Sequence, residues 1–220
     1  MIVEFVGAPG AGKTTIAQIL AERRNCPSYT LDGQRALDGG EFSGRGVALQ
    51  RSLTLVLQPA LAVEVARCAL REGSGPALSW MINLARRNLL LKRLRGVDVI
   101  LEEGPLSALC LAQASRRRPW RMAHALSLLT SSDVVVVVET DVDTAVQRIR
   151  PRGGVLHDWP EDSLRELVAA YARALEELCN AVDVPLLRFR SDRPPSVVAE
   201  SIARQLAVQE RGTNVSDSRH

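Results

Sequence analysis

Apolar residues follow two patterns along this chain. Short apolar runs, bounded by Gly, Asp or Pro, occur at 2–6, 28–31, 96–101, 133–139 and 184–188. Runs of this length are typical of strands buried on both faces of a parallel sheet. Between them lie longer segments with apolar residues at i, i+3 and i+4, which predict helices. The alternation of the two patterns predicts an α/β fold.

The helical pattern is most extensive between the second and third predicted strands. Helices are expected at 47–58, 59–72 and 76–95, with a Gly-Ser-Gly break at 73–75 and a glycine-rich loop at 39–46 before them. Further helices are expected at 106–115, 122–130, 142–150, 160–178 and 196–209. The sequence predicts a single domain over 1–210, with no internal repeat, and a frayed polar tail at 211–220.

A glycine-rich turn follows the first strand and precedes the first helix. It matches the pattern G-x-x-x-x-G-K-[ST] of a phosphate-binding loop, the P-loop. Its glycines let successive backbone N–H groups surround an anion, and the helix dipole adds positive charge. The lysine would reach the β- and γ-phosphates, and the threonine hydroxyl would bind Mg²⁺. The candidate nucleotide site is Gly7, Ala8, Pro9, Gly10, Ala11, Gly12, Lys13, Thr14 and Thr15.

Composition strengthens this interpretation of the P-loop. Lysine occurs only at Lys13 and Lys92 among 28 Lys and Arg residues. Arginine preference explains most of this bias, yet lysine persists where a compact ammonium fits and a planar guanidinium does not. A glycine-rich turn with an exposed lysine is the alternative.

Bulk properties exclude several other classes. The net charge of +3 is too small to predict a polyanion partner by itself. The cysteines form no C-x-x-C pair and the histidines show no metal-ligand spacing, so zinc and disulfide chemistry are not expected. No apolar run has the length of a membrane span and no leader pattern opens the chain, so the expected location is cytoplasmic.

An acidic pair ends the third predicted strand. Neighbouring parallel strands bring their carboxyl ends together, so Glu102 and Glu103 are expected beside the P-loop. We assign Glu102 to the metal and Glu103 to the role of general base toward an acceptor hydroxyl. A solvated acidic turn is the alternative.

Acceptor contacts are less specific. The turn after the second strand carries Asp32 and Arg35, at the sheet edge where ligands gather, although it also suits a solvated turn. Helices over 47–95 would form a wall over the acceptor, with Arg51 and Trp80 as candidate contacts.

Arginines on the segment 148–158 suggest a mobile lid. Arg148, Arg150 and Arg152 precede Gly153 and Gly154, and they would neutralise charge on the transferred phosphoryl group and exclude water. An arginine-rich chain produces such triplets readily, so a chance cluster of arginines is the alternative to a lid. The basic segment 116–121, which includes Trp120, suits either a phosphate grip or a solvated helix end.

In this order of elements the sequence resembles the P-loop kinases of small molecules, nearest to the thymidylate kinase and deoxynucleoside kinase branch. The resemblance covers nearly the whole chain, but only the P-loop is a specific motif. It implies a three-layer P-loop NTPase fold with a five-stranded parallel sheet, ATP with Mg²⁺, and a base-binding loop at 190–195 that includes Arg190 and Asp192. In that branch the acidic strand end is followed by arginine, whereas here Glu103 is followed by Gly104 and Pro105.

The expected function is transfer of a phosphoryl group from ATP to a hydroxyl or phosphate of a nucleoside, nucleotide or related metabolite. The expected partners are the nucleotide donor and a small acceptor, with a homodimer left open. A nucleotide-hydrolysing switch is the first alternative, although the chain has neither the Asn-Lys-x-Asp motif of GTPases nor the Ser-Gly-Gly-Gln signature of ABC-type ATPases. A kinase acting on DNA or RNA, gripping it with 116–121, is the second.

Overall fold

A parallel β-sheet forms the centre of the protein. The structure, a computed structural model, describes residues 1–29, 57–72, 76–115, 121–152, 156 and 158–217. Five strands pair in the order β2-β3-β1-β4-β5, all parallel. They are β1 (Ile2–Val6), β2 (Ser28–Tyr29), β3 (Val99–Leu101), β4 (Val134–Glu139) and β5 (Leu186–Arg190). The predicted α/β fold with a parallel sheet is confirmed; β2, at the edge, is only two residues long.

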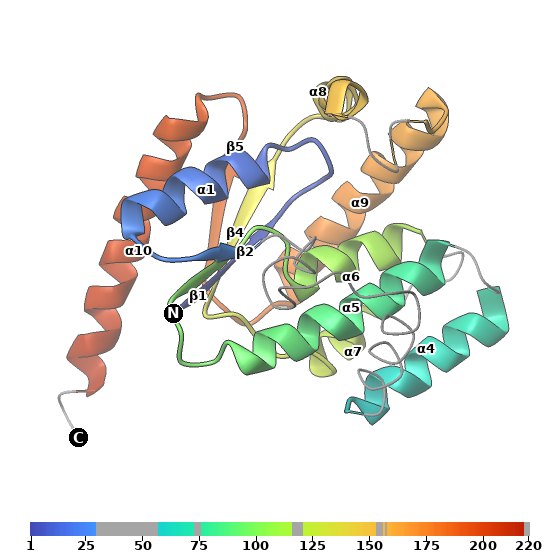
Figure 1. Ribbon diagram of the computed structural model, residues 1–220, viewed down its shortest axis with the longest axis horizontal. Coiled ribbons are helices and arrows are strands. Elements are labelled where there is room, and N and C mark those ends of the chain that lie inside the picture. Colours follow the sequence, from blue (N-terminus) through green and yellow to red (C-terminus); the bar gives the residue numbers. More distant parts are fainter. Residues whose placement is uncertain (30–56, 73–75, 116–120, 153–155, 157, 218–220) are drawn as a thin grey trace, which may run out of the picture.

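Helices cover both faces of the sheet and make three layers (Figure 1). One layer contains α1 (Lys13–Arg24) and α10 (Pro195–Asp217), which pack against each other. The other contains α4 (Pro59–Glu72), α5 (Pro76–Arg93), α6 (Pro105–Ala114), α7 (Met122–Ser127) and α9 (Glu161–Ala181). Near the carboxyl ends of the strands, α8 (Val142–Ile149) leads into the short 3₁₀ helix η1 (Arg150–Arg152).

Strand alternation explains why the core has two sides. Successive side chains of a strand point to opposite faces of the sheet. Val3 and Phe5 of β1 pack with α1 and α10, whereas Val6 packs with α6 and α9. In β4 the five valines divide in the same way and are all buried. These strands are mostly apolar because both of their faces are covered, and Glu4 in β1 is a buried exception.

Several element boundaries differ from the predicted ones. The third strand begins at Val99 rather than at 96, because Gly96 has φ +83° and Asp98 turns outward to bind the N-terminal ammonium. The fifth strand is Leu186–Arg190 rather than 184–188. The last helix was predicted to end near Gln209, with a tail from 211, and this prediction is wrong: α10 continues to Asp217. The predicted loop at 39–46 and helix at 47–58 lie almost wholly outside the described residues.

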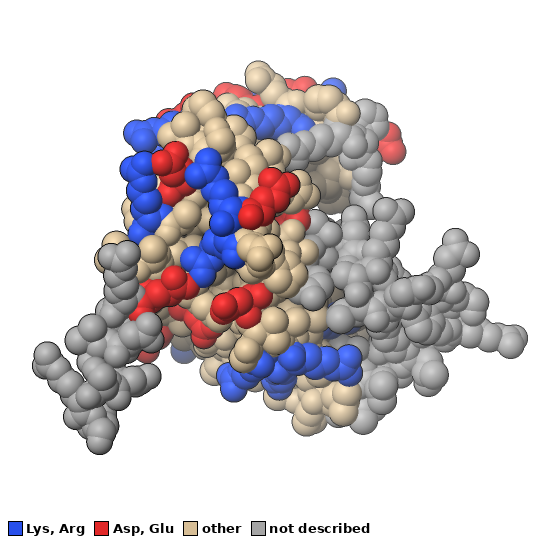
Figure 2. Space-filling model, turned by 60° about the vertical axis from the view of Figure 1, so that its left-hand side comes forward, with Lys and Arg blue, Asp and Glu red and all other residues tan. Residues whose placement is uncertain are grey.

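The exposed charges of the described part are mixed. In the view of Figure 2, Lys and Arg side chains lie next to Asp and Glu side chains instead of forming one basic field. Ion pairs such as Arg188 with Glu139 and Glu176 contribute to this mixing. No helix within the described ranges has the length and apolar character needed to cross a membrane.

Candidate active site

The P-loop joins β1 to α1 and leads into the N-terminus of that helix. Gly12 precedes the helix in a left-handed conformation, φ +85°, and no side chain caps the first turn of α1. The first N–H groups of a helix have no partner within the helix, so an uncapped N-terminus attracts an anion. The loop is closed upon itself by the N–H of Ala11, which donates to the carbonyl of Ala8 at 3.1 Å. This geometry suits a phosphate chain.

Gly10 fixes how the P-loop meets α8. Its φ is +82°, and a Cβ there would lie 2.4 Å from the carbonyl oxygen of Ala145 in α8. Only glycine fits this close approach without moving one of the two segments. The predicted lid segment therefore starts one helical turn beyond a direct backbone contact with the phosphate-binding loop.

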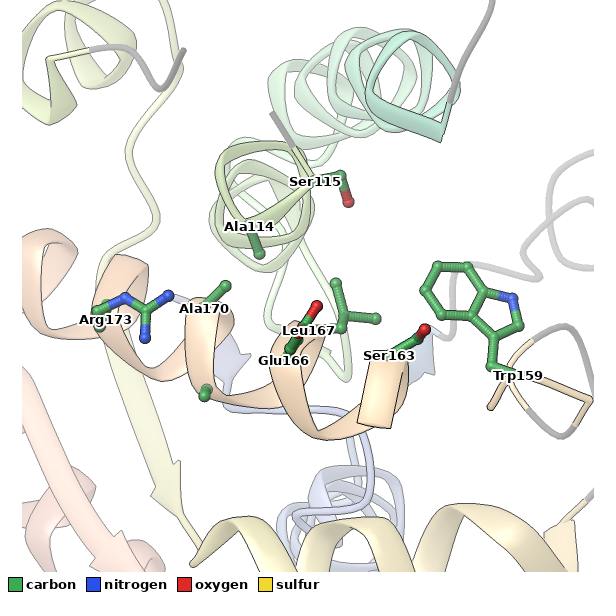
Figure 3. A pocket seen from close by; sticks show the side chains of 9 residues that line it. Ala114, Ser115, Trp159, Ser163, Glu166, Leu167, Ala170 and Arg173 are labelled. Atoms are coloured by element: carbon green, nitrogen blue, oxygen red, sulfur yellow. The ribbon is translucent and has the colours of Figure 1, made fainter. Parts of the chain in front are cut away.

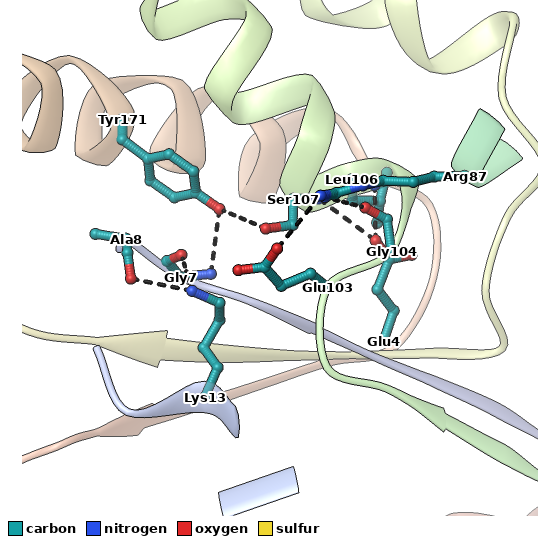
Figure 4. Close-up of polar contacts among 10 residues, drawn as sticks. All are labelled: Glu4, Gly7, Ala8, Lys13, Arg87, Glu103, Gly104, Leu106, Ser107 and Tyr171. Carbon is teal, nitrogen blue, oxygen red and sulfur yellow. Dashed lines mark hydrogen bonds and ion pairs between the residues drawn. The ribbon is translucent and has the colours of Figure 1, made fainter. Parts of the chain in front are cut away.

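The Lys13 side chain is folded back along the P-loop. Its Nζ donates to the carbonyl oxygen of Gly7 at 2.7 Å and to that of Ala8 at 3.0 Å, and the residue is 6% exposed (Figure 4). These carbonyls hold the ammonium at the rim of the loop, where phosphate oxygens would be stronger partners.

Glu102 lies on the α1 side of the sheet. Ile100 of β3 packs with α1, and residues two positions apart in a strand point to the same face of the sheet, so Glu102 points to the α1 side as well. Its carboxylate is buried, at 2% exposure. Oε1 lies 3.5 Å from Ser28 Oγ, and Oε2 has no hydrogen-bond partner among the described residues. Burial raises the pKa of Glu102, and the side chains of Thr14 and Gln18 oppose that rise. A buried carboxylate oxygen without a partner, beside the P-loop threonine, suits a cation ligand.

Glu103 lies on the opposite side, toward α5 and α6. Its side chain is 37% exposed, and Oε2 lies 3.3 Å from Nη2 of Arg87 in α5 (Figure 4). Arg87 is itself buried, and its Nη1 donates to the carbonyl of Gly104 at 3.4 Å. The two acidic residues at the end of β3 therefore have different surroundings. Glu102 is buried beside Thr14, whereas Glu103 is partly exposed beside the guanidinium of Arg87.

Glu4 and Tyr171 form buried hydrogen bonds that connect the P-loop with the acidic turn and the start of α6. Glu4, in the middle of β1, accepts from Leu106 N at 2.7 Å and from Ser132 Oγ at 2.6 Å. Burial raises the pKa of Glu4 to about 7 despite these hydrogen bonds. Tyr171 Oη accepts from Gly7 N at 3.3 Å and lies 3.2 Å from Ser107 Oγ. A continuous set of buried polar contacts thus runs from the P-loop to the start of α6.

Two of the predicted lid arginines contact neighbouring elements. Arg148 donates to Ser191 Oγ at 3.1 Å and to Ser191 O at 3.2 Å, which joins α8 to the loop after β5. Arg150 donates to Glu161 of α9 at 3.0 Å. Arg190 and Asp192, the predicted base-binding residues, are exposed and form an ion pair, with 3.3 Å between Arg190 Nε and Asp192 Oδ2.

The remaining predicted contacts are not described. Asp32, Arg35 and Arg51 lie outside the described residues, and so do the side chains of Trp80 in α5 and Arg152 in η1. Of the basic segment 116–121, only Arg121 lies in the described part, as the exposed residue before α7. Within the described ranges, no cluster of three or more His, Cys, Asp or Glu residues could hold a metal ion.

A cavity of about 520 Å³ lies between α9 and the end of α6, apart from the predicted site residues (Figure 3). Trp159 stands at one end and Arg173 at the other, with Leu167 and Ala114 on the walls. A second cavity, of about 410 Å³, lies beside the end of α1 and reaches Ser28, the neighbour of Glu102.

Sequence reasoning assigned no site role to Glu4 or Tyr171 and made no specific assignment for Arg87. Glu4 carried a usable signal, because a charged residue inside a buried strand needs a buried partner. Tyr171 was expected only to pack on the sheet, yet a buried tyrosine hydroxyl also needs a partner. Arg87 could not be singled out among the arginines of its helix, because the sequence does not say which face of α5 turns toward the acidic turn.

Comparisons with known proteins identify the fold. No family model matches the chain, and no curated protein matches it by sequence. Among solved structures, deoxyadenosine kinase from M. mycoides with products dCMP and dCDP is similar, with a TM-score of 0.62 and 16% identity over 94% of this chain and 100% of that one. The structure of the same kinase with bound dATP has a TM-score of 0.59 and 15% identity, with the same coverage of both chains. Shikimate kinase from Aquifex aeolicus has a TM-score of 0.51 and 18% identity, over 96% of this chain and 99% of that one. The chain therefore has the fold of P-loop small-molecule kinases, including the deoxynucleoside kinase branch suggested by the sequence.

Proposed function

We propose that the protein is a Mg-dependent kinase that transfers the γ-phosphoryl group of ATP to a hydroxyl or phosphate of a small acceptor. The observation that carries the proposal is the uncapped start of α1 behind Gly12, with Lys13 at its rim and the acidic turn on the neighbouring strand. The similarity to nucleotide-bound kinases supports the same choice of donor.

Lys13 and the P-loop amides bind the donor in this proposal. The β- and γ-phosphate oxygens replace the carbonyls of Gly7 and Ala8 as partners of the ammonium, and the N–H groups of the loop hold the chain of phosphates in one orientation. This placement gives the transferred group a fixed direction relative to β3. Positioning and charge stabilisation account for most of the catalysis in reactions of this kind.

Thr14 and Glu102 fit a magnesium ion. The hydroxyl of Thr14 is a ligand of the expected kind, and the unpartnered Oε2 of Glu102 is a hard anionic oxygen that can bind the ion directly or through water. When bound, Mg²⁺ would supply positive charge that offsets the negative charge developing on the phosphate chain during transfer. Thr14 and Glu102 would keep that ion on the α1 side of the sheet.

Glu103 takes the part of general base for a hydroxyl acceptor. The acceptor oxygen forms a bond to the γ-phosphorus and its proton passes to the Glu103 carboxylate. The bond from the γ-phosphorus to the bridging oxygen breaks, and ADP leaves with that electron pair. With a phosphate acceptor no proton transfer is needed, and Glu103 then orients the acceptor instead.

The proposed acceptor is a nucleoside, a nucleotide or a similar polar metabolite. The solved structures of the similar deoxyadenosine kinase contain dCMP, dCDP and dATP. In this chain α5 lies beside the acidic turn, and α4 packs against α5. Within one domain at 1–210, we assign the acceptor side to 47–95, with Asp32, Arg35, Arg51 and Trp80 as contacts, and the lid to 148–158. The cytoplasmic location and a homodimer remain predictions.

Arg148, Arg150 and Arg152 are proposed to close over the donor. Arg148 stands on α8, which contacts the P-loop at Gly10, and it is bound to Ser191 in the proposed base-binding loop. Arg190 and Asp192 lie in the same region. Closure would move these arginines toward the phosphates. The ion pair of Arg150 with Glu161 is exposed and therefore weak, so closure can break it at little cost.

An ADP-release screen with MgATP tests the proposal. Nucleosides, nucleotides, sugars, hydroxylated antibiotics and short oligonucleotides serve as acceptors. Acceptor-dependent ADP release that is lost in Lys13→Ala supports a kinase. Release of ADP and inorganic phosphate at one rate whatever the acceptor would contradict it and favour a nucleotide hydrolase. Turnover of oligonucleotides alone, with steep salt dependence, would make the acceptor a polynucleotide.

A further inference from the structure

Arg87 reaches the acidic turn from a different part of the chain. It stands on the α5 face that packs against α6, and its guanidinium is within hydrogen-bond distance of both Glu103 Oε2, at 3.3 Å, and Gly104 O, at 3.4 Å. Only 6% of the residue is exposed. Burial lowers the pKa of Arg87, and the carboxylates of Glu103 and Glu4 oppose that shift. One buried cation therefore faces two acidic side chains.

These contacts are poorly suited to a purely structural role. Charge-assisted hydrogen bonds are usually about 2.7–2.9 Å long, and both contacts of the Arg87 guanidinium are longer. Nε of Arg87 is buried and has no hydrogen-bond partner in the part of the chain that the structure describes. Burying a charge is costly, and well-packed apolar side chains are often as stable or more so. The position of the Arg87 guanidinium is therefore better explained by a role in orienting Glu103 than by a contribution to the stability of the fold.

Glu4 sets the backbone on which Glu103 stands. Gly104 precedes α6 and offers no side-chain cap, and Glu4 Oε1 instead accepts from the N–H groups of Leu106 and Ser107 at 2.7 and 3.4 Å. A Cβ on Gly104 would lie 2.3 Å from the Glu4 carboxyl, so only glycine fits between the strand and the helix. Glu4 thus fixes the turn, and among the described residues the side chain of Glu103 has its hydrogen bond with Arg87.

We propose that Arg87 is a positioning residue that directs the Glu103 carboxylate toward the P-loop, on a turn whose backbone is fixed by Glu4. In Figure 4 the Glu103 carboxylate lies between the Arg87 guanidinium and the group formed by Gly7, Lys13 and Tyr171. Tyr171, whose hydroxyl accepts from Gly7 N at 3.3 Å, also lies 3.2 Å from the hydroxyl of Ser107 in α6, the helix that follows the acidic turn. This inference rests on the proposed function, because it concerns the group that receives the proton.

The test compares Arg87→Gln, Arg87→Lys and the exposed control Arg93→Gln on the same helix. ADP release from MgATP is measured with deoxyadenosine, deoxycytidine and shikimate as acceptors, and with water alone. We expect Arg87→Gln to lower kcat about 100-fold, within the range for a general base, while the KM for MgATP changes less than about twofold. Arg87→Lys should recover part of that loss, and Arg93→Gln should match the wild type. A fall in kcat of less than about threefold in a folded Arg87→Gln protein would overturn the proposal.

A double-mutant cycle separates positioning from a general loss of structure. If Arg87 acts through Glu103, Arg87→Gln added to Glu103→Gln should lower kcat less than about threefold further. A full additional loss of about 100-fold would show that Arg87 acts independently and would overturn the inference. If the wild type releases no ADP with any acceptor, the proposed function fails. The positioning claim is then decided by the crystal structure of Arg87→Gln: a displaced Glu103 carboxylate supports it, and an unmoved one overturns it.

Discussion

At the residue scale, the candidate site depends on a few side chains with different surroundings. Lys13 is held at the rim of the P-loop, Glu102 is dry and only partly hydrogen-bonded, and Glu103 is half-exposed beside a cation. Such contrasts between neighbouring titratable groups are typical of sites in which each group has its own task.

Lys13→Ala should abolish ADP release, by at least about 100-fold, because it removes the point charge that binds the β- and γ-phosphates. The melting temperature should stay within a few degrees, since the partners of the ammonium are loop carbonyls rather than core groups. Lys92→Ala, which changes the exposed lysine of α5, is the matched control. Activity retained in Lys13→Ala would rule out the assigned donor site.

The two glutamates should respond differently to amide substitution. Glu103→Gln should lower kcat by about 10²–10⁴ with little change in MgATP affinity, as for loss of a general base. Glu102→Gln should raise the magnesium concentration needed for half-maximal rate, because it removes a charged ligand. Titration of the rate with MgCl₂ at fixed ATP distinguishes them, and the reverse pattern would exchange the two roles.

Glu4 should make the free energy of unfolding fall as the pH rises. Its pKa in the folded protein is raised from 4.5 to about 7, so the folded state keeps this proton between those values while the unfolded state loses it. The contribution is complete below about pH 4.5 and is lost as the pH rises through about 7, with a maximum of roughly 3 kcal/mol. Urea unfolding of wild type and Glu4→Gln at a series of pH values measures the difference. A difference that does not change with pH would contradict the buried, protonated state.

At the element scale, the strength of the apolar pattern decided what the sequence could predict. β1, the P-loop and β4 were placed nearly to the residue, because both faces of these strands are covered and their residues are almost all apolar. Boundaries failed where contacts remote in sequence decide them, as at Asp98, which binds the N-terminus, and at the end of α10, where Arg24 of α1 pairs with Glu210.

The candidate site was predictable only where it is made of contiguous sequence. The P-loop and the acidic pair are local motifs, whereas the contacts of Arg87 and Glu4 with the acidic turn join residues 16 to 103 positions apart. Arg87, from α5, is the arginine that the structure places beside Glu103, and no periodicity in the chain reveals this contact.

Gly10→Ala should separate the P-loop from α8. The added Cβ would meet the carbonyl of Ala145 at 2.4 Å, and the left-handed φ adds strain of about 1–3 kcal/mol. Gly96→Ala is the control, because Gly96 has nearly the same φ but open space around it. MgATP affinity and stability should both fall in Gly10→Ala, and only stability in Gly96→Ala. Equal behaviour of the two variants would show that the contact with α8 does not matter.

At the scale of the whole molecule, the strand order decides where the proposed donor and acceptor sites lie relative to each other. β1 lies between β3 and β4, so the P-loop emerges beside the acidic turn on one side and beside α8 on the other. Helices α4 to α6 cover one face of the sheet, on the side where we propose that the acceptor binds (Figure 1).

Titration calorimetry with MgATP tests the central claim most directly, because it needs no knowledge of the acceptor. We predict a measurable heat of binding and a rise in melting temperature for the wild type, both reduced when EDTA removes magnesium and both absent in Lys13→Ala. If the wild type gives no heat and no protection from melting at millimolar MgATP, the P-loop does not bind a nucleotide and the proposed function is contradicted.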